Sequence, residues 1–491
     1  MTGLFLGIDV GTSAVKALLV DDDQHVLAEA TEPLTTSRPH PLWSEQHPQD
    51  WWSAVGRAVL GLRQGSPNGL SAVRALGLSG QMHGAVLLDD GGDVLRPAIL
   101  WNDGRSHEEC RVLEQRVPAL ATIAGVPAMP GFTAPKLVWL ATHEPETFAR
   151  IGAVLLPKDY VRMRLTGERI TDRSDAAGTL WLDQATRAWS DEILRATGLS
   201  AAQMPRLVEG SEIGGMLLPE VARAWGLAEN VVIAGGGGDA AAGAVGIGAV
   251  SDGDAFISLG TSGQYFVTTA SYRPYPAAFV HAFCHAVPER WFQMAALLNA
   301  ASCLAWAAKL LHEDDIDALL GRVEAQYRSA GSLLFLPYLS GERTPHNDPY
   351  ARGVFFGLDT QTSAETLVQS VLEGVALAFA EAQDCVAAAG TRVERIAAIG
   401  GGSRSRLWMR ILANALDRPV VLYREGAKGP AFGAARLARL AVTGETVHDV
   451  CTIPPVNDVI EPESALVDAY RTAGERFRRL YCAVKAEFRL C

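Results

Sequence analysis

The chain has few cysteines, and their spacing gives no disulfide framework. Its 491 residues contain seven cysteines, which is an odd number, and no Cys-x-x-Cys pair. Secreted domains that depend on disulfides carry many cysteines at close, even-numbered spacings. We therefore expect free, mostly buried thiols in a reducing compartment, the cytoplasm. The seven are Cys110, Cys284, Cys303, Cys385, Cys451, Cys482 and Cys491.

Positive charge and long apolar runs are also scarce. Against 43 lysines and arginines stand 55 scattered acids, for a formal charge of −12, which argues against a nucleic-acid surface. Residues 1–5 lead straight into a predicted strand with no basic, cleavable leader, and no segment has the length of a membrane span. We expect a soluble protein with no nucleic-acid or membrane partner, whose anionic ligands are held by local donors and metal.

The sequence lacks a Walker Gly-x-x-x-x-Gly-Lys-Ser/Thr loop, which excludes one way of holding phosphate and no other. It contains instead two Gly-Thr-Ser turns, Gly11-Thr12-Ser13 and Gly260-Thr261-Ser262, each between two apolar strands. Glycine allows consecutive N–H groups to point at one anion, and the hydroxyls add donors. One such turn is usually an ordinary hairpin tip, whereas two predict a polyphosphate gripped from opposite sides.

Only the first turn is preceded by an acid and followed by a cation. Asp9 would repel phosphate unless Mg²⁺ lies between them, so we predict that it holds the metal, through water. The alternative is an Asp that hydrogen-bonds its own turn. Lys16 either meets the phosphates or is a solvated strand residue, and the sequence leaves both open.

The length of the chain exceeds what one hydrophobic core usually supports, and its pattern repeats. Strands are predicted near residues 4–10, 14–21, 25–31 and 73–78, with a helix over 48–62 after the third. A second set follows at 255–259, 264–268 and 290–294, before a helix from about residue 299. The duplication predicts two similar α/β domains that face each other, residues 1–249 and 250–491.

Two glycine-rich segments follow predicted strands. Gly235–Gly238 leads into Asp239, which opens an alanine-rich buried helix, and Gly400–Gly402 precedes a helix over 405–416. The first segment permits close approach of a ligand, hinge motion, or both. Because its glycines leave the backbone of the second segment accessible, we expect that backbone to lie along an adenosine.

Together these motifs resemble the FGGY carbohydrate kinases, which belong to the actin, sugar kinase and heat-shock-protein ATPase superfamily. Residues 131–140 and 353–374 fit the two family signatures. Residues 81–84, 100–105 and 338–348 look like xylulokinases rather than glycerol kinases or ribulokinases. The resemblance covers nearly the whole chain, and it implies two actin-like (ribonuclease H-like) domains with a deep cleft between them.

The resemblance further implies ATP-dependent phosphorylation of D-xylulose to D-xylulose 5-phosphate, with Mg²⁺. Asp239 is then the base that accepts the proton of the attacking hydroxyl in an in-line transfer. An Asp before three alanines is also a good helix N-cap, and the two roles are compatible. A kinase for another ketose or polyol, and a non-catalytic sugar or nucleotide sensor, stay open, as does a homodimer.

The resemblance also assigns binding residues. The sugar site comprises Met82, His83, Trp101, Asn102, Asp103 and Arg105, and the nucleotide site comprises Thr12, Ser13, Lys16, Gly260, Thr261, Gly401, Gly402 and Ser405. For the sugar group, a strand-end Trp is commonly a core residue and an Arg often only pairs with an acid. Ala240 departs from the Asn or Gln usual in the family and offers no side-chain hydrogen bond to the sugar. Either water or another side chain replaces that bond, or the preferred sugar differs in stereochemistry or length.

Overall fold

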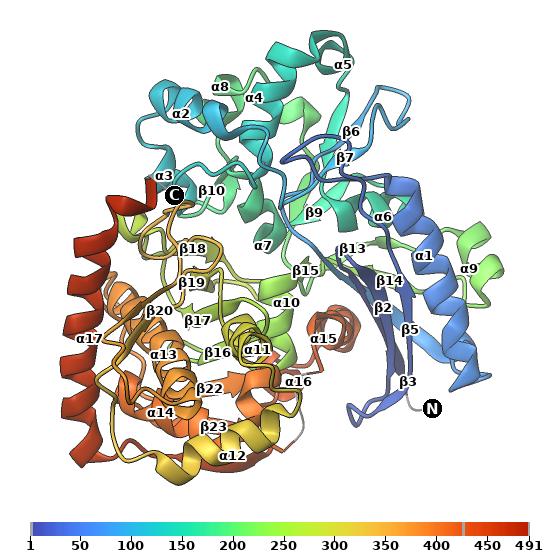
Figure 1. Cartoon of the computed structure of the whole chain (residues 1–491). Helices are drawn as coiled ribbons and strands as arrows, with labels where there is room; N and C mark the ends of the chain where they lie inside the picture. Colours follow the sequence, from blue (N-terminus) through green and yellow to red (C-terminus); the bar gives the residue numbers. More distant parts are fainter. Residues whose placement is uncertain (1–2, 425–427, 490–491) are drawn as a thin grey trace.

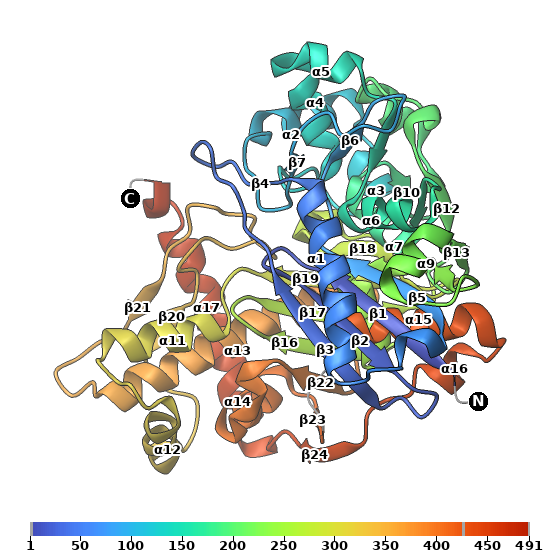
Figure 2. The ribbon, with the colours of Figure 1, turned by 90° about the vertical axis from the view of Figure 1, so that its right-hand side faces the viewer.

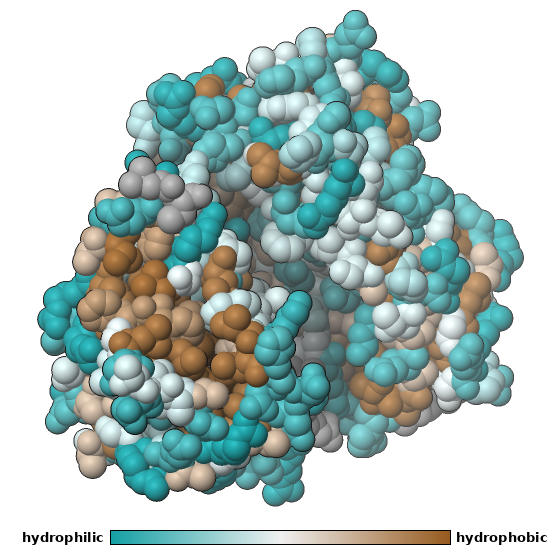
Figure 3. Space-filling view, viewed as in Figure 1, coloured by the Kyte–Doolittle hydropathy of each residue, from teal (hydrophilic) through white to brown (hydrophobic). Residues whose placement is uncertain are grey.

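The chain folds into two α/β domains that lie side by side, blue to green and yellow-green to red in Figure 1. This computed structural model describes residues 3–424 and 428–489. The expected start of the chain at Met1 and Thr2 and the thiol of Cys491 lie outside these ranges. The surface is hollowed between the two domains on the face shown in Figure 3.

The N-terminal domain is built on a seven-stranded sheet. Its order is β13-β14-β5-β1-β2-β3, with β15 also paired to β5. The strands are β1 (Leu4–Val10), β2 (Ala14–Val20), β3 (Val26–Pro33), β5 (Val73–Gly80), β13 (Ile213–Met216), β14 (Val232–Ala234) and β15 (Gly237–Gly238). The central strands are apolar and buried on both faces, as expected of a sheet with helices on each side.

The C-terminal domain repeats this pairing, which confirms the predicted duplication. Antiparallel β16-β17-β19 matches β1-β2-β3, and parallel β22 beside β16 matches β5 beside β1. Its strands are β16 (Ala255–Leu259), β17 (Gly263–Thr269), β18 (His281–Cys284), β19 (Trp291–Leu297), β22 (Ile396–Ile399), β23 (Val420–Tyr423) and β24 (Val456–Ile460).

Helices cover both sheets. The N-terminal domain carries α1 (Pro48–Gly61), α2 (His107–Arg116), α4 (Thr133–His143), α6 (Pro157–Thr166), α7 (Arg173–Ala176), α9 (Pro219–Trp225) and α10 (Asp239–Gly246). The later ones are α11 (Ala301–Leu310), α12 (Ile316–Gln326), α13 (Ala364–Ala388), α14 (Arg406–Leu416), α15 (Pro430–Thr443), α16 (Val447–Val450) and α17 (Ser464–Val484). The helix expected from residue 299 begins at Ala301, and α13 is the long helix of that domain.

Two helices, α10 and α15, lie between the sheets. Side chains of α15 pack with Phe5 and Ala75 of the N-terminal sheet, and those of α10 pack with Phe256 and Phe266 of the other. Figure 2 shows α15 beside β1 and β5, although it lies more than 350 residues later in the chain. The α10–α15 pair therefore connects the two domains.

Glycines allow these elements to touch through their backbones. A Cβ on Gly7 would lie 1.9 Å from the carbonyl oxygen of Ala431, and one on Gly77 would lie 1.9 Å from that of Ala434. A Cβ on Gly433 would lie 1.8 Å from the Ala242 oxygen. Real Cβ atoms do not approach so closely, so α15 can be seated on the sheet and on α10 only with glycine at these positions.

The cysteines meet a further expectation within the described residues. Cys110, Cys284, Cys303 and Cys451 are buried free thiols, Cys385 is half-buried and Cys482 is exposed. Among the described helices, none combines the length and the hydropathy needed to cross a membrane.

The glycine contacts predict that Gly7→Ala lowers the free energy of unfolding by about 3 kcal/mol, because the new methyl group must push α15 off β1. Chemical denaturation measures this difference. Gly321→Ala is the matched control, since Gly321 lies in exposed helix α12 with open space around its Cβ position. That change should raise the stability by about 0.5–1 kcal/mol. Equal stability of the two variants would contradict this account of the packing.

Candidate active site

Asp9 lies at the end of β1, on the face that looks toward the second domain. Alternate residues of a strand face opposite sides, so Asp9 shares its face with Phe5 and Gly7 and stands opposite Ser79 of β5. Its Oδ1 is buried and has no hydrogen-bond partner among the described residues. Burial raises the pKa of Asp9 to about 6, against the opposing effects of the Ser79 hydroxyl and the Lys16 charge.

Asp239 is the first residue of α10 and comes directly after β15, whose Gly237 also stands opposite Ser79. Its Oδ1 accepts the N–H of Ala240 at 2.7 Å. Burial first, and then the negative charge of Asp9, raise the pKa of Asp239 to about 7, although the Ala240 N–H opposes this. The fold therefore brings the two acids of the predicted site together, one from each side of β5.

Met82 and His83 follow β5 and border the same place. The Met82 thioether packs so closely on Gly238 that a Cβ there would lie 2.9 Å from Sδ. The His83 ring nitrogen Nδ1 lies 2.7 Å from the carbonyl oxygen of Gly178, which requires Nδ1 to donate. Burial lowers the pKa of His83 to about 3. The ring is neutral, so its Nε2 can accept a hydrogen bond from a sugar hydroxyl.

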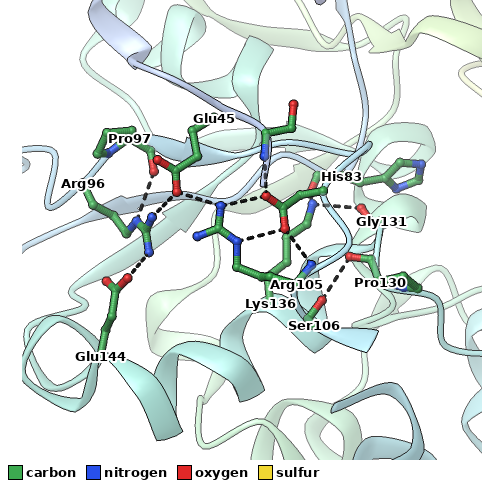
Figure 4. A network of polar contacts seen from close by, with 12 residues as sticks. Glu45, His83, Arg96, Pro97, Arg105, Ser106, Pro130, Gly131, Lys136 and Glu144 are labelled. Atoms are coloured by element: carbon green, nitrogen blue, oxygen red, sulfur yellow. Dashed lines mark hydrogen bonds and ion pairs between the residues drawn. The ribbon is translucent and has the colours of Figure 1, made fainter. Parts of the chain in front are cut away.

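A buried lysine, whose pKa burial lowers to about 7, holds the backbone of His83, which has a left-handed φ of 70°. Lys136 Nζ donates to the carbonyl oxygens of His83 and Gly131, both at 2.8 Å, and the Thr133 hydroxyl donates to the same His83 oxygen at 3.1 Å. Figure 4 shows this contact within a larger network. Sequence reasoning assigned no role to Lys136, although it lies inside the signature at 131–140.

Asp103 and Arg105 form a buried ion pair, and Arg105 is part of the network in Figure 4. Arg105 forms a forked pair with Asp103, at 2.9 and 2.7 Å, and a further ion pair with Glu45 at 2.7 Å. The Arg105 and Asp103 side chains are 1% and 0% exposed. This is the acid pairing that the sequence left open for Arg105. A direct sugar contact by either residue stays a prediction, and in this structure Asp103 also accepts the N–H of Ser44 while the Arg105 guanidinium lies over the Trp43 ring.

Trp101 connects the residues predicted to bind the sugar with those predicted to bind the phosphates. It is 42% exposed rather than a core residue, and its indole N–H donates to the Thr12 hydroxyl at 2.9 Å. Thr12 in turn donates to Gln81 Oε1 at 2.9 Å. Asn102 is exposed beside Trp101 and borders a groove with residues 38–43.

Lys16 and Ser13 lie on the rim of the first turn. Lys16 stands opposite Asp9 in the β1–β2 register, and its Nζ lies 3.2 Å from Glu29 Oε2 with 41% of the side chain exposed. Exposed ion pairs contribute little stability, so this one leaves Lys16 available to a phosphate. Ser13 is exposed.

The second turn and the late glycine segment follow adjacent parallel strands, β16 and β22, so they share one edge of the C-terminal sheet. The carbonyls of Gly260 and Thr261 accept N–H groups at the start of α11. Gly401 has open space around it, whereas a Cβ on Gly402 would lie 2.9 Å from that of Leu259. Ser405 caps α14 by accepting the Trp408 N–H at 3.3 Å. Within the described residues, no hydrogen bond joins the two Gly-Thr-Ser turns.

The raised pKa of Asp239 predicts that the metal-free protein is stabilised when this carboxylate is removed. The folded pKa, about 7, exceeds the ordinary 3.8, so ionisation destabilises the fold above pH 7, and this effect fades as the pH falls toward 4. Asp239→Asn should raise the free energy of unfolding at pH 8 by about 2 kcal/mol, allowing for partial solvent access.

Denaturation at pH 8 and pH 4.5, with a chelator present, measures this effect. Asp449→Asn serves as the control, because the Asp449 carboxylate accepts two hydrogen bonds from Thr446 and its pKa is lowered. This control should lose stability at pH 8. An Asp239→Asn variant no more stable than the parent at pH 8 would contradict the assigned electrostatics.

Known proteins match this chain along nearly its whole length. Residues 4–246 match the N-terminal domain, and residues 255–442 the C-terminal domain, of the FGGY family of carbohydrate kinases. The chain is 52% identical to a xylulose kinase of Escherichia coli (strain K12), over 97% of this chain and 98% of that protein. A crystal structure of a xyloylose kinase from Brucella ovis is 50% identical, with a TM-score of 0.95 and coverage of 98% and 99%. The xylulose kinase structure from Rhodospirillum rubrum is 31% identical, with a TM-score of 0.93 and coverage of 99% and 100%. The chain belongs to the FGGY family of carbohydrate kinases.

Proposed function

We propose that this chain transfers the γ-phosphoryl group of ATP to D-xylulose and releases D-xylulose 5-phosphate and ADP. The observation that carries the proposal is the convergence of Asp9 and Asp239 from the two sides of β5, beside Met82 and His83. The relatives named xylulose kinase at about half identity support the choice of sugar. We further propose residues 1–249 and 250–491 as the two domains, and the cytoplasm as the compartment.

Asp239 is the proposed base. Phosphorylation of an alcohol requires the attacking hydroxyl to lose its proton, and a carboxylate with a pKa near 7 can accept it at neutral pH. The proton moves from the C5 hydroxyl to the Asp239 carboxylate as the oxygen attacks the γ-phosphorus and the bond to the ADP oxygen breaks. Positioning and charge neutralisation supply most of the acceleration in such transfers.

The residues present fit a magnesium ion beside Asp9. Its buried Oδ1 has no partner within the described part of the chain, and hard cations prefer carboxylate oxygen and water. We infer that Asp9 holds Mg²⁺ through water; the bound ion would neutralise charge on the phosphates. Without a cation there, Asp9 and the phosphates would repel each other.

The remaining predicted residues divide between sugar and nucleotide. His83 Nε2 accepts a hydrogen bond from a sugar hydroxyl, Met82 provides an apolar wall, and Trp101 borders the sugar from the side of Thr12. The phosphates lie between the two Gly-Thr-Ser turns and the adenosine lies along Gly401 and Gly402. Closure of the two domains would exclude water, which otherwise competes for the phosphoryl group.

A coupled assay of ADP release with a panel of sugars tests this function. We expect D-xylulose to give the highest kcat/KM among D-xylulose, D-ribulose, L-ribulose and glycerol. Asp239→Asn should lower kcat by about 10³-fold or more, since it removes the base and alters the charge at the reacting oxygen.

The control is Asp254→Asn, because Asp254 is a part-buried acid with a raised pKa that accepts backbone N–H groups away from Asp9. This variant should keep kcat within about twofold of the parent. A higher kcat/KM for another substrate would overturn the choice of sugar. Sugar-independent ATP turnover would favour the sensor or a plain ATPase.

Ala240 yields a separate prediction on affinity. It is half-buried, directly after Asp239, and lacks the amide that the family resemblance leads us to expect there. Ala240→Asn should lower the KM for D-xylulose by roughly tenfold, because a hydrogen bond to a buried hydroxyl contributes about 1–3 kcal/mol. An unchanged or higher KM in steady-state kinetics would show that another group already satisfies that hydroxyl.

A further inference from the structure

Five charged side chains form a buried cluster beneath the glycine segment that ends at Asp239. They come from α6, β9 (Ile170–Asp172) and α7, and each is 0% exposed. The five are Lys158, Asp159, Arg162, Asp172 and Asp175. Burying so many charges is costly unless they are paired, and such clusters often add little stability over apolar packing. The cluster therefore calls for an explanation other than stability.

The three carboxylates of the cluster are close enough together to hold a metal ion, but a lysine already occupies that place. Lys158 Nζ lies 2.5 Å from Asp159, 2.7 Å from Asp172 and 3.1 Å from Asp175. Burial also raises the pKa of Asp175 well above its usual range. With Asp175 protonated, two cations balance two carboxylates, and no further ion is needed.

The cluster contacts the backbone of the glycine segment at both ends. Arg162 donates through its two terminal nitrogens to the carbonyl oxygens of Ala234 and Gly235. At the other end, the Gly238 N–H donates to the Ser174 hydroxyl at 3.1 Å. Ser174 in turn donates to Asp172, whose other carboxylate oxygen pairs with Lys158.

The segment between these contacts has little rigidity of its own, although it also bonds to the backbone of Gly210 and Glu212 and pairs with β5. Gly235 to Gly238 are four consecutive glycines, and Gly236 has a left-handed φ of 73°. Glycine has the greatest backbone freedom of any residue. Asp239 follows directly, and its Oδ1 bonds only to the N–H of its own neighbour, Ala240, among the described residues. Its position is therefore set by the backbone before it.

We propose that the buried cluster fixes the Asp239 carboxylate in place for proton transfer, with Arg162 and Ser174 as the positioning residues. The inference rests on the proposed function, in which Asp239 is the base. It predicts that loosening the segment slows the chemical step without weakening sugar binding, because the cluster itself touches neither substrate.

Ser174→Ala tests the proposal by removing the acceptor for Gly238 while leaving all five charges. It should lower kcat by about 10- to 100-fold, because small displacements of a reacting group are that costly, and leave the sugar KM within about twofold. Arg162→Lys keeps the charge but loses the forked pair of bonds, so it should lower kcat in the same way. The matched control is Ser370→Ala, a buried serine of α13 whose hydroxyl bonds only Leu367 among the described residues.

Hydrogen exchange followed by mass spectrometry gives a readout that does not depend on activity. In Ser174→Ala, amides of peptides covering 234–240 should exchange about tenfold faster than in the parent or in Ser370→Ala, since one of their hydrogen-bonded anchors is gone. Unchanged exchange there would overturn the proposal even if the parent showed no kinase activity. Parent-like kcat in both Ser174→Ala and Arg162→Lys would also overturn it, whereas an inactive parent would count against the proposed function alone.

Discussion

The backbone contact of α15 with β1, β5 and α10 is the constraint on which the rest of the molecule depends. Gly7, Gly77 and Gly433 lie where any side chain would overlap a carbonyl oxygen. Because α10 and α15 fill the space between the two sheets, the same contacts connect the two domains. Hydrophobic packing also joins the domains, since one buried cluster contains Phe132 and Trp181 of the first and Phe283 and Phe292 of the second.

The geometry of the site follows from this arrangement. On β1, the residue that follows Phe5 and Gly7 on the inner face is Asp9, and α10 begins with Asp239 at the same edge of the sheet. Burial raises the pKa of both carboxyl groups, and the charge of Asp9 raises that of Asp239 further. With these raised pKa values, Asp9 is suited to hold a metal ion and Asp239 is suited to act as a base. Carboxylates in an ion pair would instead have lowered pKa values. The charged network behind His83 and the cluster beneath Asp239 then hold these groups from outside the cleft.

Much of this could be predicted from the sequence, because the relevant signals are local. The positions of most central strands, the duplication, the helix that opens at Asp239 and both Gly-Thr-Ser turns followed from patterning and turn residues. The missing parts depend on contacts distant in sequence. Gly7 gives no sign that α15 covers it, and Lys136 and Arg162 resemble ordinary helix cations until folding places them on backbone carbonyls. Arg105 shows the opposite case. The sequence suggested it as a sugar-site residue, but in the fold its charge is paired with Asp103.

The most direct test of the account is a crystal structure of Asp239→Asn with D-xylulose, Mg²⁺ and a non-hydrolysable ATP analogue. The account predicts that the C5 hydroxyl lies in line with the γ-phosphorus and within hydrogen-bond distance of the amide that replaces the Asp239 carboxylate. It also predicts that Asp9 holds the metal through water. A sugar bound away from Met82 and His83, or a metal bound far from Asp9, would contradict it.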